Sequence, residues 1–166
     1  MLITYYSQSG NTEKLAQEVA KGAKSIENVE VKLLSIDQVK ESDLLDASAI
    51  IVGSPVYNAN VAPAVLEFIN SWPFEDRPLK NKIGAAFSTG GGISIGEELV
   101  MLNILHSMLI QGMIVVGGEE TEAGFGASAV TGEGPFDGGE MNELFLKKGF
   151  GLGSRVAKLV AKFPAD

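Results

Sequence analysis

Five short runs of apolar and β-branched residues recur along the chain, separated by amphipathic stretches. The runs cover residues 2–6, Val29–Ile36, Ser48–Gly53, Ile83–Phe87 and Met113–Gly117. Continuous apolar runs of this length predict buried β-strands. Between the first two runs, apolar residues recur at helical spacing with charged residues on the opposite side, which predicts an amphipathic helix. Further helices are predicted over Asp37–Ala47, Pro63–Trp72, Gly96–Gln111 and Gly139–Lys162.

This alternation of strands and helices predicts the fold class. Right-handed crossovers between consecutive strands leave few arrangements other than a parallel sheet with helices on both faces. The expected fold is therefore α/β, with a doubly wound five-stranded parallel sheet. No linker or repeat divides the chain, so residues 1–166 are expected to form a single domain. One long loop is expected, over residues 118–139.

Composition narrows the classes of function. The chain is 45% hydrophobic and 20% charged, with a mean hydropathy of +0.17, which excludes intrinsic disorder. No apolar run approaches the roughly 18 residues of a membrane span. The first residues lack the layout of a secretory signal, so a cytoplasmic location is expected. A net charge of −8 disfavours nucleic acids and anionic membranes as partners.

The inventory of reactive side chains is small. The chain has no cysteine, and His106 is its single histidine, which excludes thiol chemistry, iron–sulfur clusters and multi-histidine metal sites. Glu119, Glu120 and Glu122 are interpreted as a solvated acidic edge, so no metal site is expected. Chemistry must therefore come from a bound cofactor, or from hydroxyls and carboxylates.

The loop after the first strand, Ser7–Thr12, leads directly into a helix. Its sequence, SQSGNT, places hydroxyls, an amide and a glycine at the helix N-terminus, a set of donors suited to an anion. The loop lacks the lysine of a triphosphate-binding loop and the three spaced glycines of a dinucleotide turn. The functional interpretation is one phosphate held by neutral donors. The alternative is helix capping by Asn11 or Ser9, with a turn at Gly10.

Two further loops follow the third and fourth predicted strands. Residues 53–60, GSPVYNAN, offer an aromatic face and side-chain amides, and residues 88–96, STGGGISIG, offer backbone that can approach a flat ring closely. Turn chemistry alone could explain either loop. In open parallel sheets, however, ligands bind beyond the carboxyl ends of the strands. The three loops together therefore predict a slot for a planar heterocycle with a polar edge.

These segments resemble a known family. Residues 5–12, YYSQSGNT, resemble the phosphate loop of flavodoxin-like proteins, and Gly53–Tyr57 resembles a loop of FMN-dependent NAD(P)H:quinone reductases. More specifically, the WrbA-like branch is matched in order by Ser88–Gly91, Gln111–Val115, Phe125–Ser128 and Arg155–Ala157. The resemblance covers nearly the whole chain. It implies the flavodoxin strand order 2-1-3-4-5, for which FMN binding between strands 1 and 3 is the known example.

The resemblance also implies the cofactor-binding residues. They fall into a phosphate group and two groups flanking the isoalloxazine ring: Ser7, Gln8, Ser9, Gly10, Asn11 and Thr12; Pro55, Val56, Tyr57 and Asn58; and Ser88, Thr89, Gly90, Gly91 and Gly92. If a phosphate lies at this helix start, Thr12→Glu should weaken FMN binding by at least about tenfold to a hundredfold and leave the apoprotein folded, since acidic residues suit the first helical turn.

The implied activity is that of an FMN-dependent NAD(P)H oxidoreductase that reduces quinones by hydride transfer through the flavin, with no catalytic residue from the protein. The alternative is a flavodoxin-type one-electron carrier without its own substrate pocket. A third class is a flavin-free domain that binds protein partners. Gly90–Gly92 and Ile93 stand where a carrier's second aromatic residue would cover the flavin, so one flavin face is expected to be open. An open face favours the enzyme.

Two helices carry further expectations. Residues 96–111 are apolar around most of the helix circumference, which predicts a homo-oligomer, with His106 on a narrow polar line. Gly149, Gly151 and Gly153 lie inside the last helix with no strand before them, so they are interpreted as sites of close helix packing rather than a dinucleotide motif. Trp72 is expected to be a core or edge residue.

Overall fold

The computed structural model describes residues 1–119, 123–137 and 139–163 of the chain. The strands are β1 (Leu2–Tyr5), β2 (Lys32–Ser35), β3 (Ala49–Tyr57), β4 (Asn60–Val61), β5 (Ile83–Gly90), β6 (Ile114–Val115) and β7 (Ala127–Val130). The α-helices are α1 (Asn11–Lys24), α2 (Glu41–Asp46), α3 (Pro63–Asn70), α4 (Glu97–Ile110) and α5 (Glu143–Lys162). Short 3₁₀ turns cover Ile36–Gln38 and Gly134–Phe136.

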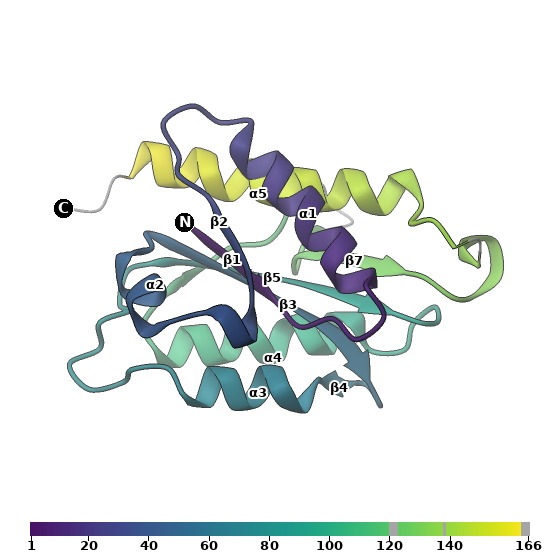
Figure 1. Ribbon diagram of the computed structural model, residues 1–166, viewed down its shortest axis with the longest axis horizontal. Coiled ribbons are helices and arrows are strands. Elements are labelled where there is room, and N and C mark those ends of the chain that lie inside the picture. The colour runs from purple at the N-terminus through teal and green to yellow at the C-terminus, as the bar shows by residue number, and fades with distance from the viewer. Residues whose placement is uncertain (120–122, 138, 164–166) are drawn as a thin grey trace.

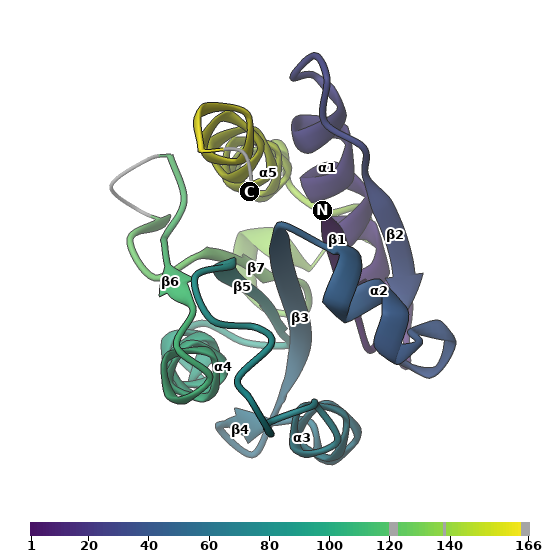
Figure 2. The ribbon, with the colours of Figure 1, turned by 90° about the vertical axis from the view of Figure 1, so that its left-hand side faces the viewer.

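The strands form a parallel sheet in the order β2-β1-β3-β5-β6. Helices α1 and α5 cover one face, and α3 and α4 cover the other (Figures 1 and 2). This arrangement confirms the predicted doubly wound parallel sheet. The carboxyl ends of β1, β3 and β5 lie together at the right of Figure 1, beside the start of α1.

The last strand position is occupied by two short pieces. Strand β6 pairs with the start of β5, and β7 pairs with its carboxyl half, from Phe87 to Gly90. Between these two strands, the Gly118 amide donates to the Ala123 carbonyl at 2.7 Å. A Cβ on Gly117 would lie 2.0 Å from the Gly124 oxygen, so glycine is required at this approach. The prediction of one continuous loop over residues 118–139 is therefore wrong at β7.

The second predicted strand is shorter than its apolar run. Strand β2 begins at Lys32 rather than Val29, and its side chains are only partly buried because it lies at the sheet edge.

The helix predicted over Asp37–Ala47 is instead a 3₁₀ turn followed by α2. Lys32 Nζ donates to Asp43 Oδ1 at 2.8 Å, which ties β2 to α2, and the Lys40 amide donates to Asp43 Oδ2.

This ion pair predicts a pH-dependent contribution to stability. The Lys32 hydrogen bond holds the pKa of Asp43 below its ordinary value of 3.8. Asp43 therefore stabilises the fold above pH 3.8, and this contribution is lost as the pH falls through the depressed pKa. Asp43→Asn should lower the urea midpoint at pH 7, and the difference from wild type should shrink below pH 3.8. The exposed Asp37→Asn is the control, and a difference that persists at low pH would contradict the assignment.

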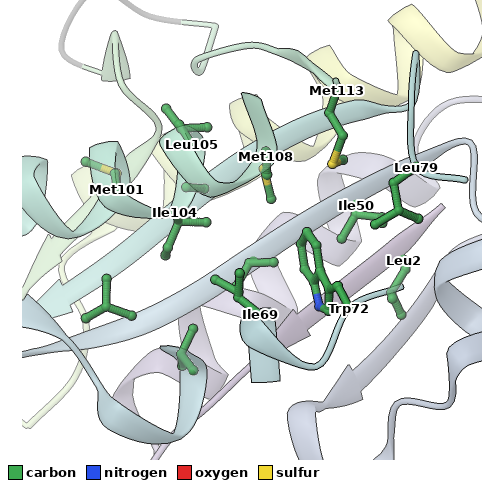
Figure 3. Close-up of a cluster of buried hydrophobic side chains, with 14 of the residues drawn as sticks. Leu2, Ile50, Ile69, Trp72, Leu79, Met101, Ile104, Leu105, Met108 and Met113 are labelled. Atoms are coloured by element: carbon green, nitrogen blue, oxygen red, sulfur yellow. The ribbon is translucent and has the colours of Figure 1, made fainter. Parts of the chain in front are cut away.

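Two hydrophobic clusters fill the faces of the sheet. The cluster under α3 and α4 contains Trp72, Met108 and Met113 (Figure 3), and Trp72 is 4% exposed, which confirms its expected place in the core. His106 is exposed on α4, as expected of a polar-line residue. Helix α4 also leaves apolar side chains at the surface, at Leu99, Leu109 and Ile110. The homo-oligomer inferred from this helix stays a prediction.

Helices α1 and α5 cover the other face of the sheet and pack closely against each other. A Cβ on Gly153 would lie 1.8 Å from the Val19 carbonyl oxygen, and one on Gly22 would lie 1.9 Å from the Phe150 oxygen. Gly149 packs against Leu15 in the same interface. The helix-packing interpretation is confirmed for Gly149 and Gly153. Gly151 faces away from α1, toward Glu119.

Among the described residues, no helix combines the length and apolar character that crossing a membrane requires.

Candidate functional site

The predicted phosphate loop joins β1 to α1 at the carboxyl edge of the sheet. Gly10 is the N-cap of α1 and has a φ of +86°, a left-handed conformation that favours glycine. Among the described residues, no side chain caps this helix. The alternative interpretation, helix capping by Asn11 or Ser9, is therefore wrong. The amide groups of the first turn therefore remain available to a ligand.

The side chains of this loop differ in their surroundings. Ser7 Oγ is buried and has no hydrogen-bond partner among the described residues. Asn11 is half-buried and donates to Thr131 Oγ1 at 3.2 Å. Thr12 is only 1% exposed, and its hydroxyl lies 2.7 Å from the Thr89 hydroxyl at the end of β5. The loop thus offers neutral donors, one of which is an orphaned buried hydroxyl.

The second loop is a hairpin rather than an irregular connection. Strand β3 continues through Tyr57, turns at Asn58 and Ala59, which both have positive φ, and returns as β4. Pro55, Val56 and Tyr57 therefore belong to a strand, and Asn58 is an exposed turn residue.

Tyr57 is held in place by contacts with the first loop. Its hydroxyl donates to Gln8 Oε1 at 2.6 Å, and its ring packs edge-on against Tyr6 with centroids 6.5 Å apart. Burial raises the pKa of Tyr57, with a smaller contribution from Tyr6. The phenol therefore stays neutral at physiological pH and presents its aromatic face at a fixed position.

The third segment, Ser88–Gly92, begins inside β5. Ser88 is fully buried, and its hydroxyl donates to the Glu97 carbonyl at the start of α4. Thr89 faces α1 through its contact with Thr12. Gly90 ends the strand, Gly91 is exposed, and Gly92 is buried. At the carboxyl edge of the sheet, Gly90–Gly92 thus form a stretch of backbone without side chains.

A cavity of about 210 Å³ lies where these three segments meet. Ten of the fifteen predicted residues line it: Gln8, Ser9, Asn11, Thr12, Pro55, Val56, Tyr57, Thr89, Gly90 and Gly91. The other five, Ser7, Gly10, Asn58, Ser88 and Gly92, are adjacent in the chain but do not line it. Thr131 lines the cavity as well and was missed, because the sequence places it inside an expected loop. Strand β7, which precedes Thr131, is only four residues long, so no local signal in the sequence marks this position.

Other features do not compete with this site. A larger cavity, of about 660 Å³, lies at the opposite, amino end of β5 and β6, and contains none of the predicted residues. Its Lys82 Nζ is engaged by the carbonyls of Leu45 and Ala47. The described residues contain no group of three side chains suited to a metal ion, and Glu120 and Glu122 lie outside the described residues.

Comparison with known proteins places the chain among flavoproteins. Residues 41–127 match the model of the NADPH-dependent FMN reductase family. A flavodoxin from Aquifex aeolicus is 33% identical, with 98% of this chain and 88% of the relative covered. An NAD(P)H dehydrogenase (quinone) from Sinorhizobium fredii is 31% identical, with 98% and 97% covered.

Comparison of structures agrees on the fold. A flavodoxin, WrbA-like protein from Agrobacterium tumefaciens superposes with a TM-score of 0.78 at 21% identity, with 97% of this chain and 96% of that chain covered. The family match spans more than half of the chain, and two relatives above 30% identity cover nearly all of it. The chain therefore belongs to the NADPH-dependent FMN reductase family of FMN-binding flavodoxin-like oxidoreductases.

Proposed function

We propose that this chain is an FMN-dependent NAD(P)H oxidoreductase that reduces small quinones by hydride transfer. The FMN phosphate would be held by Ser7–Thr12, and the isoalloxazine ring would stack on Tyr57 with the backbone of Gly90–Gly92 along its edge. FMN, when bound, supplies the redox chemistry, which the side chains of this chain lack. One observation carries the proposal. The same cavity is lined by neutral hydrogen-bond donors, by the fixed aromatic face of Tyr57 and by backbone that has no side chains.

The phosphate loop fits one terminal phosphate. The uncapped start of α1 leaves backbone amides for an anion, and the orphaned Ser7 hydroxyl lacks the partner that a buried polar group requires. A dianion at a helix N-terminus is also favoured by the helix dipole. The loop has no lysine or carboxylate side chain, so the residues present suit a phosphate bound without a divalent ion.

The residues around the proposed position of the isoalloxazine ring favour an enzyme over an electron carrier. Of the described residues that line the cavity, Tyr57 is the single aromatic one. Gly90 and Gly91 line the same cavity, and Ile93, two residues further along, is 50% exposed. A ring stacked on Tyr57 would keep its other face open to a nicotinamide or a quinone at contact distance. The protein would then bind and orient the flavin and leave its open face accessible to the substrates. No acid or base from the protein is required.

Direct reduction by a nicotinamide tests this proposal. The FMN-loaded protein should lose its visible flavin absorbance when NADPH or NADH is added without oxygen, and a small quinone should restore it. Because both substrates would use the same open face in turn, steady-state rates should give parallel double-reciprocal lines. If dithionite reduces the flavin while both nicotinamides leave it oxidised, the carrier alternative replaces the enzyme. If the protein binds no FMN, both are wrong.

A further inference from the structure

The segment that follows β7 runs along the glycine-rich end of β5. The Thr131 amide donates to the Gly90 carbonyl at 2.9 Å, and the Thr131 hydroxyl lies 3.2 Å from the same oxygen. At Gly132, a Cβ would lie 2.9 Å from the Gly91 oxygen, so the two backbones are in close contact. Residues 131–133 thus lie directly beside the segment along which the edge of the ring is proposed to lie.

Thr131 connects two parts of the site that are distant in sequence. Its hydroxyl oxygen accepts a hydrogen bond from Asn11 Nδ2 in the phosphate loop and is within donating distance of the Gly90 carbonyl. It also lines the cavity itself. This double contact fixes which way the Asn11 carboxamide points. With Nδ2 turned to Thr131, the Asn11 side chain has a set orientation at the cavity wall.

Glu133 contacts the glycine-rich segment further along the chain, at Gly92 and Ile93. Its Oε2 accepts a hydrogen bond from the Ile93 amide at 2.7 Å. The same oxygen would lie 2.8 Å from a Cβ on Gly92, so the carboxylate lies against a glycine. Glycine-rich backbone loses much entropy when it is ordered, and a charged acceptor gives a stronger hydrogen bond than a neutral one. Glu133 is therefore placed to hold Gly91–Ile93 in one conformation.

We propose that residues 131–133 form a third wall of the cofactor site, with Thr131 positioning Asn11 for the phosphate and Glu133 positioning the glycine-rich segment for the ring. This inference rests on the proposed cofactor site and adds residues to it. It predicts that the two side chains affect different parts of FMN. Riboflavin, which has the ring but no phosphate, separates the two effects.

The Thr131 half is tested with Thr131→Val, which keeps the side-chain shape and removes the hydroxyl. FMN binding, followed by quenching of flavin fluorescence, should weaken about twofold to tenfold, the effect of one hydrogen bond, while riboflavin binding stays unchanged. Thr4→Val is the matched control, because Thr4 is buried in β1 and its hydroxyl has no hydrogen-bond partner among the described residues. Equal FMN affinity in Thr131→Val and wild type, or an equal loss for riboflavin, would overturn this role for Thr131.

The Glu133 half is tested with two substitutions. Glu133→Ala removes the acceptor of the Ile93 amide and should weaken FMN and riboflavin alike, by about threefold to tenfold. Glu133→Gln keeps an acceptor oxygen and should restore most of the affinity for both ligands. Hydrogen exchange of the Ile93 amide in the apoprotein should speed up in the alanine variant alone. The exposed Glu67→Gln on α3 controls for the lost charge.

The outcomes separate this inference from the proposed function. If wild type binds neither FMN nor riboflavin, the cofactor site itself is wrong. If wild type binds both and Glu133→Ala binds them equally well, the site stands and this role of Glu133 is wrong. If Glu133→Gln is as weak as Glu133→Ala, the hydrogen bond to Ile93 is not what positions the segment, and the inference also fails.

Discussion

Gly153→Ala is expected to lower the free energy of unfolding by at least about 2 kcal/mol, although alanine is the better helix former. The added methyl group would lie 1.8 Å from the Val19 carbonyl oxygen and 2.9 Å from the Ala23 amide nitrogen. Both are backbone atoms inside α1, so no side chain can rotate away. The helices must separate, and the core beneath them, which includes Leu152 and Val156, loses packing.

Gly151→Ala is the matched control on the same helix. A Cβ there would lie 3.3 Å from the Cβ of Glu119, which is exposed, and it would face away from α1. We expect this variant to be neutral or more stable, by up to about 1 kcal/mol, from helix propensity. Urea denaturation of both variants gives the comparison. Similar midpoints for Gly153→Ala and Gly151→Ala would contradict the backbone contact between α1 and α5.

The layered fold was predictable because its signals are local and repeated. Buried parallel strands such as β3 and β5 are continuous apolar runs, and the helices between them show a helical period. The glycines of α5 could be interpreted from their place inside a helix. The position of the site followed from the general rule that ligands bind at the carboxyl ends of parallel strands.

Elements that depend on distant contacts could not be predicted. Strand β7 is four residues long, and its sequence, ASAV, carries little local strand signal; it is recognised as a strand by its pairing with the carboxyl half of β5. Thr131 enters the site through that pairing, 120 residues along the chain from Asn11. The β3–β4 hairpin likewise depends on positive φ at Asn58 and Ala59, where sequence alone suggests an ordinary turn.

The orientation of individual hydroxyls was also beyond the sequence. The sequence predicts that Thr12→Glu leaves the apoprotein folded, since acidic residues suit the first turn of a helix. The structure corrects this expectation: Thr12 is 1% exposed and contacts Thr89 in the interior. A glutamate there would be buried without a cationic partner among the described residues, and the apoprotein would be destabilised. A better test of the phosphate loop is a substitution at Asn11, which lines the cavity and is only half-buried.

Asn11→Asp provides that test and is expected to reduce FMN affinity about tenfold to a hundredfold. The substitution preserves size but replaces the amide donor with an anion. It removes a hydrogen bond to a charged group, about 1.5–3 kcal/mol, and places like charges together at the start of α1. Each 1.4 kcal/mol is a factor of ten in the dissociation constant. The apoprotein should keep or gain stability, since aspartate in the first helical turn contributes about 0.3–1 kcal/mol.

Gln17→Glu is the matched control for Asn11→Asp, because it adds the same charge to the same helix at an exposed position away from the cavity. It should leave FMN affinity unchanged. Riboflavin should bind Asn11→Asp about as well as wild type, since the repulsion acts on the phosphate alone. The FMN defect should also shrink at high salt, because a half-buried pair of charges is partly screened. An equal loss for riboflavin would place the defect at the ring, and unchanged FMN affinity would mean that the phosphate does not bind at the start of α1.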